Sequence, residues 1–186
     1  MVEAITNLDL SIMLYVQENL RTGVGNAIMK CITHLGDAGC FWIAVGVILL
    51  FFKKTRPIGF SVLVSLVINA IFTNLTLKDL IARPRPFVVS DAIVTLVKEP
   101  GSFSFPSGHT SASVTAALVL FKLTPKKYGI PAVILAALIA LSRIYVGVHY
   151  PTDILGGLIV AVVSSIWGCY LVKCIYMRVK ERKCHD

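Results

Sequence analysis

The sequence predicts an all-α fold, a polytopic membrane helix bundle, from two observations. Of the 186 residues, 56% are hydrophobic and 15% are charged, whereas a soluble domain has about 45–50% apolar and about 25% charged residues. The apolar residues also stand in long runs, and a helix that crosses a bilayer needs about 20 of them in succession. We therefore expect about five transmembrane helices, preceded by N-terminal interfacial helices.

The N-terminal segment, residues 1–37, mixes apolar and charged positions. Ile12 stands between Asp9 and Glu18, a combination that suits a helix lying in the interface better than one crossing it. Gly23 then separates this helix from a second short one, and a weak sixth span is the alternative. The segment lacks the basic start and clean apolar core of a signal peptide, so no cleavage is expected.

Five apolar runs follow without a polar, Pro/Ser-rich linker, so we expect a single integral-membrane domain over residues 1–186. The runs are 38–52, 58–77, 107–123, 128–145 and 151–176. We expect them to form a catalytic helix bundle over residues 38–176, followed by a basic cytoplasmic tail over residues 177–186.

The net charge of +8 is mostly a signal of topology. Basic residues gather around the connection between runs one and two, around the connection between runs three and four, and at or after the end of run five. They are Lys53, Lys54, Arg56, Lys122, Lys126, Lys127, Lys173, Arg178, Lys180, Arg182 and Lys183. With five spans these places share one side, which the positive-inside rule assigns to the cytoplasm. No nucleic-acid partner is needed to explain the charge.

The five cysteines predict neither a zinc site nor a disulfide framework. Their number is odd and no two of them form a CxxC pair. Small apolar packing is the simplest reading of these side chains. We expect no metal and no other cofactor.

A first group of candidate residues opens the run at 107–123. Ser107 follows Pro106 and is a natural N-cap, and the free backbone N–H groups near Gly108 and His109 favour an anion. Gly108 also lets a ligand approach the backbone closely. Taken alone, this motif is more often a capped helix start with an interfacial histidine.

A second group stands between the last two runs. Asp153 lies one helical turn after His149, close enough to bond one ring nitrogen and set the tautomer. The other nitrogen then keeps a lone pair, which a nucleophile or a general base requires. The alternative is a structural Asp–His pair, although a membrane-embedded aspartate favours function. Arg143 ends the preceding run on the same side.

A third group, Lys78 and Arg85, follows the run at 58–77. A lysine supplies a compact charge, and an arginine supplies a planar fork for two phosphate oxygens. A basic stop at the membrane interface is the alternative. The three groups fall at helix ends on one side of the membrane, so together they indicate chemistry on a phosphate.

The order and spacing of these residues resemble the type 2 phosphatidic acid phosphatase superfamily of membrane lipid phosphatases. The family pattern is Lys, six residues, Arg-Pro, then Pro-Ser-Gly-His, then Ser-Arg, five residues, His, three residues and Asp. The matching residues are Lys78, Arg85-Pro86, Pro106 to His109, Ser142-Arg143, His149 and Asp153. No motif position departs from the pattern, and the resemblance covers roughly residues 38–176.

The resemblance implies a metal-independent phosphatase. By family analogy His149 attacks phosphorus and becomes a phosphohistidine, with Asp153 orienting its ring. His109 protonates the leaving oxygen and then activates water. The phosphate is held by Lys78, Arg85, Ser107, Gly108 and Arg143.

The substrate class is open. An outward-facing site on a small chain favours a bacterial cell-membrane enzyme, and undecaprenyl pyrophosphate is the first substrate expected by family analogy. Phosphatidylglycerophosphate and phosphatidic acid are alternatives, as are a lipid phosphotransferase and a non-catalytic lipid-phosphate binder.

Two segments near these residues carry further expectations. Apolar residues between 87 and 105, including Ile93 and Leu96, recur at helical spacing and predict a short amphipathic helix that guides lipid into the site. A helix that only seals the bundle is the alternative. His34 and Asp37 are expected only to cap and anchor.

Overall fold

The computed structural model describes the backbone of residues 2–185 and the side chains of residues 3–178. This part of the chain is helical and contains no strand, which confirms the all-α fold. The longer helices are α1 (Val2–Asn19), α2 (Gly23–His34), α3 (Cys40–Leu50), α4 (Arg56–Phe72), α7 (Gly108–Leu123), α8 (Lys126–Tyr145) and α9 (Pro151–His185). The short elements are the 3₁₀ turn η1 (Asp37–Gly39), the π-helical turn η2 (Thr73–Leu77), α5 (Lys78–Ile81) and α6 (Pro86–Val89).

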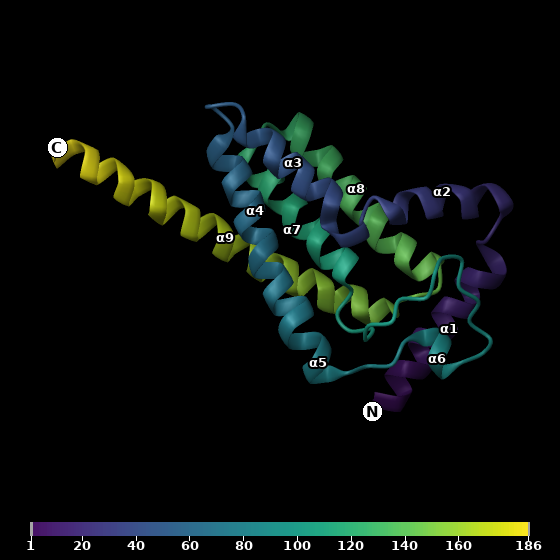
Figure 1. Ribbon diagram of the computed structural model, residues 1–186. Coiled ribbons are helices and arrows are strands. Elements are labelled where there is room, and N and C mark those ends of the chain that lie inside the picture. The colour runs from purple at the N-terminus through teal and green to yellow at the C-terminus, as the bar shows by residue number, and fades with distance from the viewer. Residues whose placement is uncertain (1, 186) are drawn as a thin grey trace.

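Helix α7 lies at the centre of the bundle, in contact with α3, α4, α8 and α9 (Figure 1). Small residues such as Ala116 and Ala117 are fully buried on it, which lets the neighbouring helices approach closely. The indole of Trp42 on α3 donates to the hydroxyl of Ser113 at 2.9 Å. Ile139 of α8 completes this core.

Three stretches are long and apolar enough to cross a membrane: Arg56–Val89, Lys126–Tyr145 and Pro151–Arg178. A fourth results if α2 and α3, which meet at a bend of 43°, form one broken span. Length and composition therefore support three or four spans, where the sequence predicted about five. Helix α7 accounts for part of the difference, because it has only 16 residues and its neighbours in the bundle cover much of it.

The basic residues gather at one end of the bundle. Lys54, Lys122 and Lys173, one from each predicted group, line a single cavity of about 750 Å³. Helix α9 continues as a helix to His185, beyond the expected end of the span at residue 176. The side chains of the predicted basic tail from residue 179 onward lie outside the described residues.

The segment that follows α6 is not the amphipathic helix that the sequence predicted. Only Pro86–Val89 is helical there, and the chain then runs in turns and extended backbone to Ser107. Ile93 is buried against Met13 and Tyr150, while Leu96 packs on a second cluster. The helical spacing of the apolar residues did not correspond to a helix here, because Ile93 and Leu96 pack into two different clusters of the bundle. They do not form one lipid-facing surface.

Candidate active site

The catalytic candidates of the α8–α9 connection lie together as the spacing predicted. Helix α9 begins at Pro151, which places Asp153 one turn beyond His149. The His149 Nδ1 atom lies 3.2 Å from Asp153 Oδ2. Since the Nδ1–H group donates a hydrogen bond to the carboxylate, the lone pair of the ring is on Nε2. The Arg85 Nη1 atom lies 3.4 Å from this Nε2 atom. The predicted Asp–His hydrogen bond is confirmed.

His149 is a neutral imidazole at physiological pH. Its side chain is 2% exposed. Burial lowers the pKa of His149 to about 3, against the opposing effect of the hydrogen bond to Asp153. A neutral ring with an unprotonated Nε2 is the form that can act as a nucleophile.

Asp153 is held by further partners that sequence reasoning did not assign. The Ser104 hydroxyl donates to Oδ2 at 2.5 Å, and the Tyr150 backbone N–H donates to the same oxygen at 2.9 Å. The Arg83 Nη1 atom lies 2.8 Å from Oδ1. Each of these contacts fixes the carboxylate and, through it, the imidazole ring of His149.

Arg83 joins this carboxylate to the N-terminal helix. Its Nη2 atom lies 2.8 Å from Oδ2 of Asp9 on α1, and its guanidinium stacks 3.8 Å from the centre of the Tyr150 ring. Asp9 also accepts hydrogen bonds from the backbone and the hydroxyl of Thr152. Helix α1 is therefore part of the support for the site, where the sequence predicted only an interfacial element.

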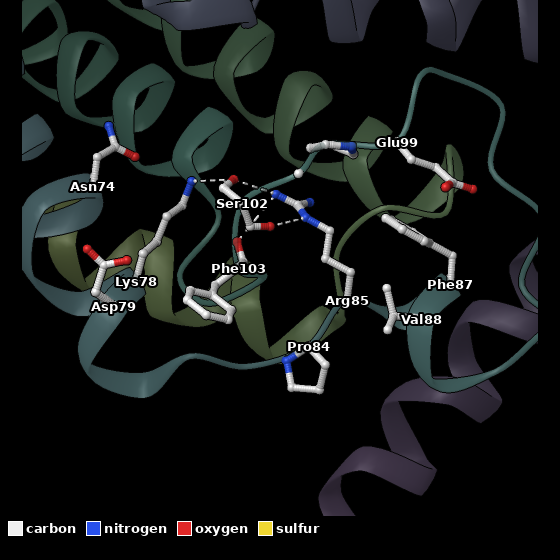
Figure 2. A pocket seen from close by; sticks show the side chains of 12 residues that line it. Asn74, Lys78, Asp79, Pro84, Arg85, Phe87, Val88, Glu99, Ser102 and Phe103 are labelled. Atoms are coloured by element: carbon white, nitrogen blue, oxygen red, sulfur yellow. Dashed lines mark hydrogen bonds between the residues drawn. The ribbon is translucent and has the colours of Figure 1, made fainter.

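The three other candidate cations have no carboxylate partner among the ion pairs of the described residues. Lys78 and Arg85 point toward Ser102 from opposite sides (Figure 2), with Lys78 Nζ 3.3 Å from its hydroxyl and Arg85 Nε 2.7 Å from its carbonyl oxygen. Arg143 donates to Thr33 at 2.6 Å. Its buried Nε has no partner.

Ser107 is the N-cap of α7, as the sequence predicted. Its hydroxyl accepts from the backbone N–H of Thr110 at 3.4 Å and from the Thr110 hydroxyl at 3.0 Å. Its own N–H donates to the carbonyl of Asp153 at 3.1 Å, which ties the start of α7 to the start of α9. A Cβ added to Gly108 would stand 3.8 Å from Lys78 Nζ, so this glycine faces the cation cluster.

His109 has a partner that sequence reasoning missed. Its Nε2 atom lies 2.8 Å from Oδ1 of Asp37, and the other oxygen of Asp37 lies 2.8 Å from His34 Nδ1. The expectation that His34 and Asp37 only cap and anchor is therefore wrong for Asp37. No local sequence pattern could predict this contact, because Asp37 and His109 are 72 positions apart in the chain.

Two cavities meet at Lys78 and Asn74. One, of about 690 Å³, is lined by Lys78, Arg85 and the loop around Ser102 (Figure 2). The other, of about 450 Å³, lies between α3, α4 and α7, and His109 lines it. A phosphate near the cations would thus lie between a cavity whose wall carries four charged side chains and a cavity lined mainly by apolar residues. Within the described part of the chain, no three His, Cys, Asp or Glu side chains converge as metal ligands do.

Fold and site together define a class of protein: a helical membrane bundle with a buried histidine–aspartate pair beside three unpaired cations. The model of the PAP2 superfamily matches residues 58–176, which is more than half of the chain. The chain therefore belongs to the PAP2 superfamily, which confirms the resemblance seen in the motifs.

The sequence of this chain is also similar to those of known phosphatases. The chain is 40% identical over 116 residues to an undecaprenyl-diphosphatase of Sulfolobus acidocaldarius and 37% identical over 111 residues to the undecaprenyl-diphosphatase BcrC of Bacillus subtilis. These matches cover 62% and 60% of this chain but only 56% and 54% of those relatives. The chain thus spans little more than half of their length.

A solved structure extends the likeness to nearly the whole fold. The crystal structure of a transmembrane PAP2-type phosphatidylglycerolphosphate phosphatase from Bacillus subtilis superposes with a TM-score of 0.72 at 30% identity. The match covers 95% of this chain and 88% of that one. The chain is therefore a multi-pass membrane protein.

Proposed function

We propose that this chain is a metal-independent lipid phosphatase that hydrolyses a phosphate or pyrophosphate ester of a membrane lipid through a phosphohistidine. The observation that carries the proposal is the group of cations formed by Lys78, Arg85 and Arg143. A buried cation without a counter-charge is costly, and the unpaired Nε of Arg143 leaves a donor directed at no protein acceptor. A phosphate bound among them supplies both the charge and the acceptors.

The proposed reaction has two steps. In the first, the lone pair on His149 Nε2 attacks phosphorus, the bond to the leaving oxygen breaks, and His109 gives that oxygen a proton. Asp153 holds the ring of His149 and stabilises the positive charge that the attack creates on it. In the second step His109 takes a proton from water, which displaces the phosphate from His149. Phosphoryl transfer needs mainly such positioning and charge stabilisation.

The remaining site residues hold the phosphoryl oxygens. Lys78, Arg85 and Arg143 supply charge, which is worth most where water is excluded. The Ser107 hydroxyl accepts two hydrogen bonds and keeps its own O–H to donate. The backbone N–H groups at Gly108 lie at the start of α7, where a helix binds anions best.

The cavity beside His109 supports a lipid as the leaving group. Its walls include Leu63, Leu66 and Val67 of α4 and Ile43 of α3. Ile43 and Val67 are exposed on the bundle surface, where a membrane would surround them. A lipid chain in this space would place its ester oxygen on the side of the proton donor His109.

Undecaprenyl pyrophosphate is the substrate we propose to test first, because two relatives carry that activity in their names. Phosphatidylglycerophosphate, named for the structural neighbour, and phosphatidic acid are the alternatives. We place the site on the extracytoplasmic side of a bacterial cell membrane, since the basic residues gather at the opposite end of the bundle.

The test is phosphate release by purified protein in detergent with EDTA present. The three lipids are offered in parallel, with His149→Ala as the control. Release by the wild type and none by the variant is expected, and the relative rates rank the substrates. Transfer of labelled phosphate to an acceptor lipid instead of water would make the protein a phosphotransferase. Lipid binding without turnover would make it a binder.

A further inference from the structure

The break between α2 and α3 is conformationally strained. Ala38 has a φ of +49°, a left-handed conformation that costs free energy for a residue with a Cβ, and Gly39 follows with a φ of +68°. Such strain persists only where the surrounding structure fixes it, and it is often found at functional sites. The strained turn carries Asp37 at its first position.

Asp37 reaches His109 because its neighbour Gly36 has no side chain. A Cβ on Gly36 would stand 2.7 Å from Cδ2 of the His109 ring and 2.8 Å from Ile139. The bare backbone therefore lets the ring lie against the turn. In that position His109 Nε2 is 2.8 Å from one oxygen of Asp37, while His34 holds the other.

The charges around His109 show what this carboxylate does. Lys78 from α5 and Arg143 from α8 are the cations that act on the ring, and Asp37 from η1 is the anion. A proton donor for the leaving group must carry a positive charge beside those two cations. A neighbouring carboxylate favours the charged form of a histidine. Asp37 is the anion that acts against this repulsion.

We propose that Asp37 is a positioning residue that orients His109 and favours the protonated form that its role as the acid requires. The inference rests on the proposed function. With Nε2–H held by Asp37, the proton on Nδ1 is the one that passes to the leaving oxygen. The P–O bond to that oxygen breaks as the bond from phosphorus to His149 Nε2 forms.

The test compares two leaving groups in the variant Asp37→Asn. Octyl phosphate releases an alkoxide that needs a proton, whereas 4-nitrophenyl phosphate releases a stable phenolate that does not. The two esters are compared by kcat/KM. This parameter reports only on the steps up to the first irreversible one, so the later attack of water does not contribute to it. General acid catalysis contributes about 10²–10⁴-fold, and losing the support of the acid should remove about 10–100-fold of it for the octyl ester. The nitrophenyl ester should change less than about threefold.

The ratio of the two values is measured on one preparation, so any loss of folded protein cancels. Asp37→Glu, which restores a carboxylate, should recover part of the ratio. Asp79→Asn, which removes another acid from the cavity lined by Lys78, should leave it unchanged. Equal losses for both esters, or no loss for the octyl ester, would overturn the role of Asp37. Wild-type protein inactive on both esters, or active His149→Ala, would instead reject the proposed function.

Discussion

The two histidine–aspartate pairs of the site are built in opposite ways. The side chains of His149 and Asp153 are 2% and 0% exposed, and Asp153 accepts four hydrogen bonds. Those of His109 and Asp37 are 19% and 56% exposed. The His149–Asp153 pair, which is proposed to form the covalent bond, is held by hydrogen bonds and buried from solvent. The His109–Asp37 pair, which is proposed to exchange protons with the lipid and with water, is partly exposed, so both can reach it.

The difference has an energetic side. Asp153 is a buried carboxylate whose counter-charge is Arg83, and breaking a buried ion pair of this kind costs about 3–5 kcal/mol. An exposed pair is worth only about 0–1 kcal/mol, because water screens it. Changes in the buried half should therefore affect both stability and rate, whereas changes in the open half should affect the rate alone.

The largest effect is expected for Asp153→Asn. The carboxamide keeps the shape of the side chain but can direct its NH₂ group at Nδ1, which would place the lone pair of His149 on the wrong nitrogen. In a hydrolase with a comparable pair such a change lowers kcat by about 10⁴-fold. Steady-state kinetics on the preferred lipid measures it, with Asp37→Asn as the matched variant in the open half. Equal losses in the two variants would remove the distinction between the pairs.

Arg83→Met should give the largest loss of stability. It leaves the buried carboxylates of Asp9 and Asp153 without their shared counter-charge, at a cost of about 3–5 kcal/mol. Arg83→Lys keeps the charge but not the fork that spans both carboxylates, so it should lie between Met and wild type. Chemical unfolding in detergent checks this, with exposed Lys98→Ala as the control. An Arg83→Met protein as stable as the wild type would show that α1 does not support the site.

Ile93→Ala should cost about 2–5 kcal/mol, as other buried isoleucines do. Ile93 is 5% exposed, whereas its neighbour Val94 is 57% exposed, so Val94→Ala should stay within about 0.5 kcal/mol. Unfolding of the two variants measures the difference. A lipid-guiding surface would behave differently: Ile93→Ala would then raise KM for long-chain lipids and leave stability unchanged.

The smallest effect is expected from acid. Because burial lowers the pKa of His149 to about 3, its reactive neutral form persists as the pH falls through the range where histidines usually titrate, about 6.5. After correction for the ionisation of the substrate, kcat/KM should not decline between about pH 7 and about pH 5. A tenfold loss over that interval would mean that His149 has the pKa of an ordinary histidine. The His149–Asp153 pair would then be more accessible to solvent than the structure indicates.

The sequence predicted the local parts of this site well. Proline and serine set the start of α7, and a spacing of four residues on one helix end brought Asp153 to His149. Both effects act within one turn, where the chain itself determines the geometry. The bundle then brings the motif residues near one another, because the Ser107 N–H donates to the Asp153 carbonyl and Gly108 faces Lys78.

The contacts that the sequence did not predict join distant segments. Asp9 and Arg83 are 74 residues apart, and Asp37 reaches His109 only because a strained turn and a glycine allow it. The apolar residues of the 87–105 segment matched a helical period, yet tertiary packing distributed them among separate clusters. Side-chain pattern alone cannot distinguish these outcomes, because each depends on which segments the bundle brings together.

The π-helical turn η2 has a consequence for how this chain can change over time. The Lys78 backbone N–H reaches back five residues to the carbonyl of Thr73, so the turn holds one residue more than an α-helix would. Each residue of an α-helix turns the chain by about 100°, and deleting one from 73–77 would swing Lys78 out of the phosphate site. Leu75 within it is 74% exposed in a stretch that can cross the membrane, so another apolar side chain should be accepted there. The gene can therefore accept apolar substitutions at position 75 but should accept no deletion within 73–77.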